Sequence, residues 1–108
     1  MKSSPMTPEE ETEVLSILNA VGVTLTARPW THERFVDHYS GNYTWDLSNG
    51  WNVTVFCDCG EWDYIDNVEA ADGRQWDYPH EPQVSPMTYA VADWQPSKEN
   101  QAAWGVEL

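Results

Sequence analysis

Carboxylates are the most abundant side chains in this sequence that can do chemistry. The 108 residues contain 18 Asp and Glu, three His and two Cys, against only five Lys and Arg. A pair of carboxylates can supply the acid and the base of a glycosidase, and Cys with His can form a thiol active site. No spacing in the chain favours either arrangement, and the P-loop, dinucleotide-binding, G-x-S-x-G and H-E-x-x-H motifs are missing. We therefore expect no catalytic residues and a protein that is not an enzyme.

Residue types that bind metals are present, but not at the spacing of a metal site. The two cysteines lack the second Cys or His pair of a structural zinc site. The acidic stretch from Asp58 to Asp66 lacks the ligand order and the glycine of an EF-hand. We expect no metal and no cofactor. The zinc-binding residue types in the chain are Cys57, Cys59, His32, His38 and His80.

The formal net charge of −13 limits the partners that this chain can bind. Proteins hold DNA, RNA and anionic membranes through Lys and Arg, so a chain this acidic does not bind them through its overall field. The N-terminus lacks the apolar core of a secretory signal, and no apolar run reaches the roughly 20 residues that span a bilayer. We expect a cytoplasmic protein with reduced thiols.

Two helices are predicted near the ends of the chain. Apolar residues at helical spacing predict a helix over residues 8–21, which begins with Thr7 as N-cap and Pro8 in the first turn. A second, short helix is expected over residues 96–104, ended by Gly105. We expect residues 1–7 to form a flexible N-terminus and residues 8–108 to form a single compact domain.

The middle of the chain predicts an antiparallel meander of about four strands. Apolar and polar residues alternate through 43–47, 51–57, 61–69 and 75–78, with short turns between them. In the first hairpin, a three-residue loop that ends at Gly50 pairs Trp45 with Val53 and Tyr43 with Val55. That register puts the large apolar side chains on one face.

Three further segments are less distinct in the sequence. Val23–Ala27 alternates as a short strand does, and Thr31–Tyr39 fits either a short helix or a loop. Thr88–Trp94 is expected to be an edge strand or a loop. The prediction for the whole chain is an α+β fold in which an N-terminal amphipathic helix and a short C-terminal helix pack on one face of the meander.

Strand parity places many of the carboxylates on one face of the predicted sheet. The apolar face would hold Trp45, Val53, Val55, Trp62, Tyr64 and Trp76, and the opposite face Asp46, Asp58, Glu61, Asp63, Glu69 and Asp77. A second cluster at the first helix comprises Glu9, Glu10, Glu11 and Glu13. Rows of side chains about 7 Å apart along strands and about 4.8 Å across them approximate the spacing of backbone phosphates. The alternative is a solvated surface that only promotes solubility.

In size and charge, the chain is similar to small phage-encoded inhibitors that imitate nucleic acid, including anti-restriction proteins, uracil-glycosylase inhibitors and anti-CRISPR proteins. The resemblance covers composition and no aligned motif. It implies a non-catalytic inhibitor whose carboxylates replace phosphates in the basic nucleic-acid-binding site of a host nuclease or effector complex. The two acidic clusters above are the residues that we expect to bind this partner.

Two other functions fit the composition. A carbohydrate-binding module would stack sugars on exposed Trp and Tyr, and a viral structural or assembly protein would carry its acidity incidentally. Seven tryptophans are many for one small core, and four lie near turns or element ends, where we expect partial exposure: Trp30, Trp51, Trp94 and Trp104.

Overall fold

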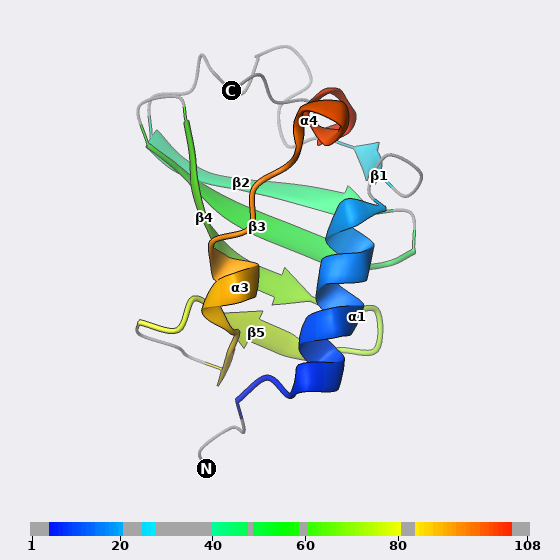
Figure 1. Cartoon of the computed structure of the whole chain (residues 1–108), viewed down its shortest axis with the longest axis vertical. Coiled ribbons are helices and arrows are strands. Elements are labelled where there is room, and N and C mark those ends of the chain that lie inside the picture. Colours follow the sequence, from blue (N-terminus) through cyan, green and yellow to red (C-terminus); the bar gives the residue numbers. More distant parts are fainter. Residues whose placement is uncertain are drawn as a thin grey trace.

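Helices cover one face of a six-stranded sheet in this protein (Figure 1). The computed structural model describes residues 5–20, 25–27, 40–47, 49–58, 61–80 and 84–104. The strands lie in the sheet in chain order, and each pair of neighbours is antiparallel except β5 and β6. They are β1 (Leu25–Ala27), β2 (Ser40–Leu47), β3 (Asn52–Asp58), β4 (Glu61–Glu69), β5 (Gln75–Asp77) and β6 (Ser85–Pro86). The helices are α1 (Pro8–Asn19), α3 (Tyr89–Ala92) and α4 (Lys98–Trp104).

The predicted α+β fold is therefore confirmed. β2 to β5 are the four strands of the predicted meander, and β1 falls within Val23–Ala27 as expected. The expectation for Thr88–Trp94 was wrong, because its centre forms the one-turn helix α3. Four residues are too few for helical periodicity to be visible in a sequence. Thr31–Tyr39 lies outside the described residues.

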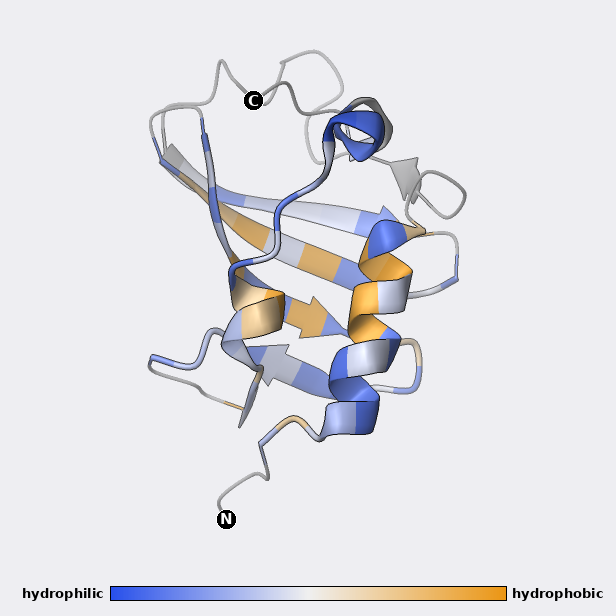
Figure 2. Cartoon of the chain, viewed as in Figure 1, coloured by the Kyte–Doolittle hydropathy of each residue, from blue (hydrophilic) through white to orange (hydrophobic). Residues whose placement is uncertain are grey.

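Helix α1 begins where its sequence predicts. The Thr7 hydroxyl accepts a hydrogen bond from the Glu10 N–H, and the Glu10 side chain accepts one from the Thr7 N–H. This capping box satisfies two N–H groups that have no partner inside the helix. Val14 and Leu18, four residues apart, are fully buried against the sheet. Figure 2 shows hydrophobic residues in α1, in α3 and in the central strands that these helices cover.

The β2–β3 hairpin has the predicted register. Trp45 lies opposite Val53 and Tyr43 opposite Val55. The loop closes through a hydrogen bond from the Leu47 N–H to the Trp51 carbonyl (2.8 Å), and Gly50 has a φ of 89°. A positive φ at this position is accessible to glycine at little cost, which explains why the three-residue loop ends there.

Strand β4 departs from simple alternation. Its pairing with β3 shifts register twice, between Thr54 and Val55 and again between Phe56 and Cys57. Each shift leaves one extra residue on β4, so the buried residues are spaced by three: Trp62, Ile65 and Val68. The assignment of Tyr64 to the apolar face was therefore wrong, since Tyr64 lies opposite Phe56 on the other face and Ile65 takes its place inside.

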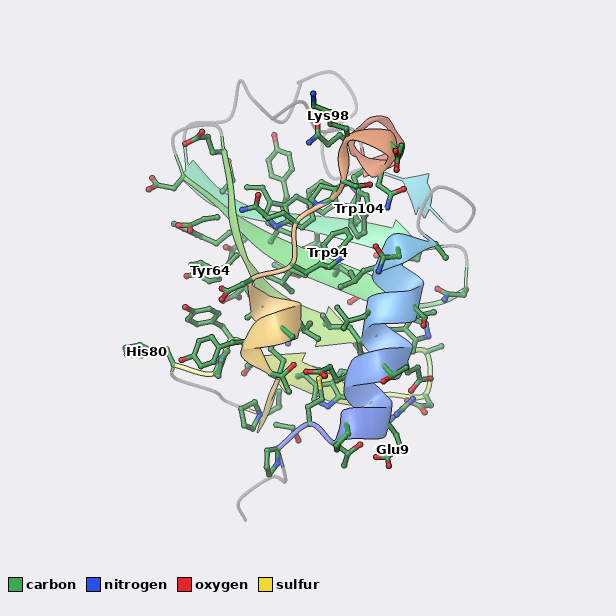
Figure 3. All side chains as sticks on the ribbon, in the orientation of Figure 1. Glu9, Tyr64, His80, Trp94, Lys98 and Trp104 are labelled. Carbon is green, nitrogen blue, oxygen red and sulfur yellow. The ribbon has the colours of Figure 1, made fainter. Side chains whose placement is uncertain are left out.

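Four tryptophans form the centre of the core at the α4 end of the sheet. Trp45, Trp62, Trp94 and Trp104 have ring centroids 5.3–5.7 Å apart in five pairs. The Trp45 Nε1–H donates to the Trp104 carbonyl (2.8 Å), and the Trp62 Nε1–H donates to the Trp94 carbonyl (3.1 Å). Two strand indoles thus fix both ends of the segment 94–104. Trp94 and Trp104 are labelled in Figure 3.

The expected partial exposure of Trp51 and Trp104 was wrong. Trp51 is buried in a stacked pair with Trp76, at a centroid distance of 6.2 Å, and Trp104 is completely buried. Trp94 is half-buried, as predicted, and Trp30 lies outside the described residues. Indoles can share one small core here because the N–H groups of Trp45 and Trp62 find backbone acceptors and the rings meet edge to face or at a tilt.

Replacing Trp104 with Ala tests the importance of this cluster. The change removes a ring that three other indoles contact, so we expect a loss of about 3–5 kcal/mol in the free energy of unfolding. Urea denaturation followed by circular dichroism measures it. Tyr89→Ala is the control, because Tyr89 is 56% exposed and its loss should change stability by about 0.5 kcal/mol or less. A loss below about 1 kcal/mol for Trp104→Ala would contradict the role given to the cluster.

Two glycines with positive φ provide a matched test of the hairpin loop. Gly50 and Gly73 have φ values of 89° and 95°. An added Cβ would lie 3.1 Å from the Ala71 Cβ at Gly50 but would meet nothing within 4 Å at Gly73. We expect each substitution to Ala to cost about 1–2 kcal/mol of unfolding free energy, with Gly50→Ala the larger. Thermal denaturation of the two variants checks the order, and the reverse order would show that the hairpin loop is not tightly held.

Candidate docking face of the sheet

The outer face of the sheet, opposite the helices, carries the candidate site. No described helix lies on this face (Figure 1). The register of the strands arranges its side chains in four rows across the sheet. The first row holds Asp46, Asn52, Glu69 and Gln75, and the second holds Thr44, Thr54, Asn67 and Asp77. The third holds Asn42, Phe56 and Tyr64, and the fourth holds Asp58 and Glu61.

The six carboxylates predicted for this face fall mainly on its two outermost rows. Asp58 and Glu61 lie directly opposite each other where β3 meets β4. Asp46 and Glu69 both lie opposite Asn52, at the other end of the strands. Asp63 is exposed at one of the β4 bulges. The face is therefore most acidic at its two ends, and of the two rows between them one is uncharged and the other contains Asp77.

Asp77 has a structural role in addition to its charge. Its carboxylate accepts hydrogen bonds from the Asn67 Nδ2 (2.7 Å) and from the Val84 N–H (3.1 Å). These bonds connect β5 to β4 and to the chain that enters β6.

The second predicted cluster lies on the helix-covered side of the sheet. The Arg74 guanidinium, before β5, contacts three carboxylates: Asp72 (2.9 Å), Glu13 (3.2 Å) and Glu10 (3.5 Å). Arg74 also lies over the Trp76 ring, 5.3 Å from its centroid. The hydrogen bond from Arg74 lowers the pKa of Asp72. Glu10 and Glu13 are thus used to attach α1 to the β4–β5 turn, whereas Glu9 (labelled in Figure 3) is exposed and Glu11 half-buried.

A strip of aromatic rings, which the sequence interpretation missed, crosses the outer face and continues around the sheet edge. The aromatic strip consists of Phe56, Tyr64, Tyr78 and Tyr89. Successive ring centroids lie 5.3, 4.2 and 6.2 Å apart. The first three rings are half-buried and Tyr89 is exposed; Tyr64 is labelled in Figure 3. The spacing of three between Trp62, Ile65 and Val68 was the signal for the bulges that turn Tyr64 outward.

Carboxylates surround the centre of the aromatic strip. Burial raises the pKa of Tyr64, and Asp66, Asp63 and Tyr78 raise it further. Burial also raises the pKa of Asp66, with a second contribution from the negative charge of Asp77. These carboxylates lie close enough to feel one another's charge, so ionisation here has a free-energy cost that a bound cation would reduce. Sequence parity had grouped Asp66 with the apolar face.

Cations are scarce in the part of the chain that the structure describes. Its Lys and Arg residues are Arg74, which is bound to α1, and Lys98, which begins α4. Within the same ranges, no group of three or more His, Cys, Asp and Glu side chains is placed to hold a metal ion, and the Cys57 side chain is buried. No described helix is long and apolar enough to cross a membrane.

Fold and face together define a small acidic α+β protein with one helix-covered and one carboxylate-bearing sheet surface. A family model described as "Domain of unknown function (DUF7693)" matches residues 7–89, which is more than half of the chain. The chain therefore belongs to this family. Comparisons with curated proteins and with solved structures gave no match. The matched region contains α1, all six strands and the whole aromatic strip, and it ends before Trp94 and α4.

Asp66→Asn tests the electrostatic cost on this face. Because the pKa of Asp66 is raised in the folded state, the ionised carboxylate destabilises the fold at pH values above that pKa. This destabilisation declines as the pH falls toward 3.8, the ordinary pKa of the group. We expect Asp66→Asn to raise the melting temperature at pH 7 and to have no such effect below pH 3.8. Thermal melts across pH check it. The neighbouring exposed Asp63→Asn is the control, and equal gains for both variants at every pH would contradict the explanation.

Proposed function

We propose that this protein is a small non-catalytic inhibitor that docks the outer face of its sheet against a basic nucleic-acid-binding site of another protein. The observation that carries the proposal is the gathering of carboxylates on a sheet face without described helix cover. Glu61, Asp63, Asp66 and Glu69 all lie there. The two described cations lie elsewhere.

The proposed mechanism is competition by charge and shape. Carboxylates at the two ends of the outer face would pair with Lys and Arg side chains that otherwise hold phosphates. The less acidic rows between them would contact the floor of the groove. A net charge of −13 would also steer the protein toward a basic groove, which raises association rates at low ionic strength. No covalent step is needed.

The outer face supports this role better than the acidic start of α1. Glu10 and Glu13 already pair with Arg74 inside the fold, so a partner would have to displace an existing contact. The carboxylates of Glu61 and Asp63 are exposed on the strands. We therefore assign partner binding to the outer face rather than to the α1 cluster.

In its specific form, the proposal follows the resemblance to phage-encoded inhibitors. The partner would be a host nuclease or effector complex of the anti-restriction or anti-CRISPR target type, and the protein would act in the host cytoplasm. The alternative of a carbohydrate-binding module loses support among the described tryptophans, because five are buried and Trp94 is half-buried. Among the described residues, the tyrosines of the aromatic strip would be the most accessible rings for sugar stacking.

Capture experiments with charge variants test this function. The protein is immobilised, and nucleic-acid-binding proteins are captured from a bacterial lysate at low and at high salt. We expect the capture to weaken with salt and to be displaced by added duplex DNA. The triple variant Glu61→Gln, Asp63→Asn, Glu69→Gln should bind the captured partner roughly tenfold more weakly.

The matched control removes the same charge from other surfaces. Glu9→Gln, Glu11→Gln, Glu99→Gln also loses three carboxylates, on α1 and α4. We expect it to retain most of the affinity. Equal losses for the two triple variants would show that only net charge matters, and a partner that DNA does not displace would contradict nucleic-acid mimicry.

A further inference from the structure

The aromatic strip would be unusual on an acidic surface that served only to keep the protein soluble. Phe56, Tyr64, Tyr78 and Tyr89 join rings from β3, β4, the end of β5 and α3 into one continuous row. The β5 strand pairs only with Asn67 to Glu69 of β4, so the strip passes beyond the end of β5 and around the sheet edge. A partner can therefore approach it from the outer face and from the side.

We propose that the aromatic strip and the carboxylates beside it bind arginine side chains presented by a protein segment of the partner. Guanidinium groups would stack on the rings of Tyr64 and Tyr78 and pair with Asp63 and Asp66. This inference rests on the proposed function and narrows it, since it names the side chain that the docking face recognises.

The chemistry of the strip favours arginine over lysine. A guanidinium group is planar and weakly hydrated, so it can stack on an aromatic face and still donate two parallel hydrogen bonds to a carboxylate. A lysine ammonium is a compact, strongly hydrated charge and loses more by leaving water. Rings with carboxylates at their margins therefore discriminate between two cations that a simple acidic surface would bind alike.

The protein contains one example of this arrangement within its own fold. The Arg74 guanidinium lies 5.3 Å from the Trp76 ring centroid while its nitrogens contact Asp72, Glu13 and Glu10. Around Tyr64, a ring and two acidic neighbours, Asp63 and Asp66, are arranged without a described arginine. Docking would supply the missing cation and lower the electrostatic cost of the carboxylates.

Two fluorescent peptides of equal length, an oligoarginine and an oligolysine, provide the test with the full-length protein. At low salt we expect both to bind, with the arginine peptide roughly threefold to tenfold tighter. The double variant Tyr64→Leu, Tyr78→Leu should remove this preference and leave the affinity for oligolysine nearly unchanged. Tyr64→Phe, which keeps the ring, should retain the preference.

Each other outcome is decisive. Equal binding of the two peptides, with strong salt dependence, would overturn the arginine inference but would still agree with the proposed function of the acidic outer face. Binding of neither peptide at low salt would overturn the inference and also contradict the proposed function. A preference for arginine that survives in the double variant would exclude the strip. If the double variant fails to fold, Tyr89→Ala, at an exposed ring, should reduce the preference, and an unchanged preference would overturn the inference.

Discussion

Two indole hydrogen bonds hold the segment 94–104 against the central strands of the sheet. Trp45 and Trp62, on β2 and β4, donate to the carbonyls of Trp104 and Trp94. The rings of these four residues pack against one another at tilted and edge-to-face angles. The segment 94–104 is thereby fixed on the helix-covered side, which completes the apolar core there and leaves the outer face to polar residues.

One-sided burial determines where the charge of the protein can lie. Carboxylates are too costly to bury without partners, so the apolar inner face excludes them. They gather on the outer face and on α1, where Arg74 offsets part of their repulsion. On the outer face, burial and the negative charge of Asp77 still raise the pKa of Asp66. A cationic partner bound at this surface would reduce the free-energy cost of ionising Asp66. The aromatic strip adds rings on which, in our proposal, a guanidinium group stacks.

Local patterns in the sequence were sufficient to predict where α1 begins and how the strands of the first hairpin pair. The capping residues of α1 lie within four positions of one another, and only one loop length put Trp45, Val53 and Val55 on one face. The two bulges of β4 could not be predicted from the alternation of apolar and polar residues. Each bulge moves the residues beyond it to the opposite face of the sheet, so the second bulge reverses the effect of the first, and Glu69 lies on the outer face as simple alternation predicts. The burial of Trp104 depends on contacts with β2 and β4 far away in the sequence. The aromatic strip was missed for the same two reasons, since it needs the outward turn of Tyr64 and the approach of Tyr89.

Mapping backbone amide chemical shifts by NMR, while an oligoarginine peptide is added, tests most directly whether the outer face is the docking surface. The account predicts the largest changes around Thr54, Tyr64 and Asn67, which lie next to one another across β3 and β4. Amides of α1 should change little, because Glu10 and Glu13 already pair with Arg74. Changes concentrated on α1, with the outer strands unaffected, would contradict the account.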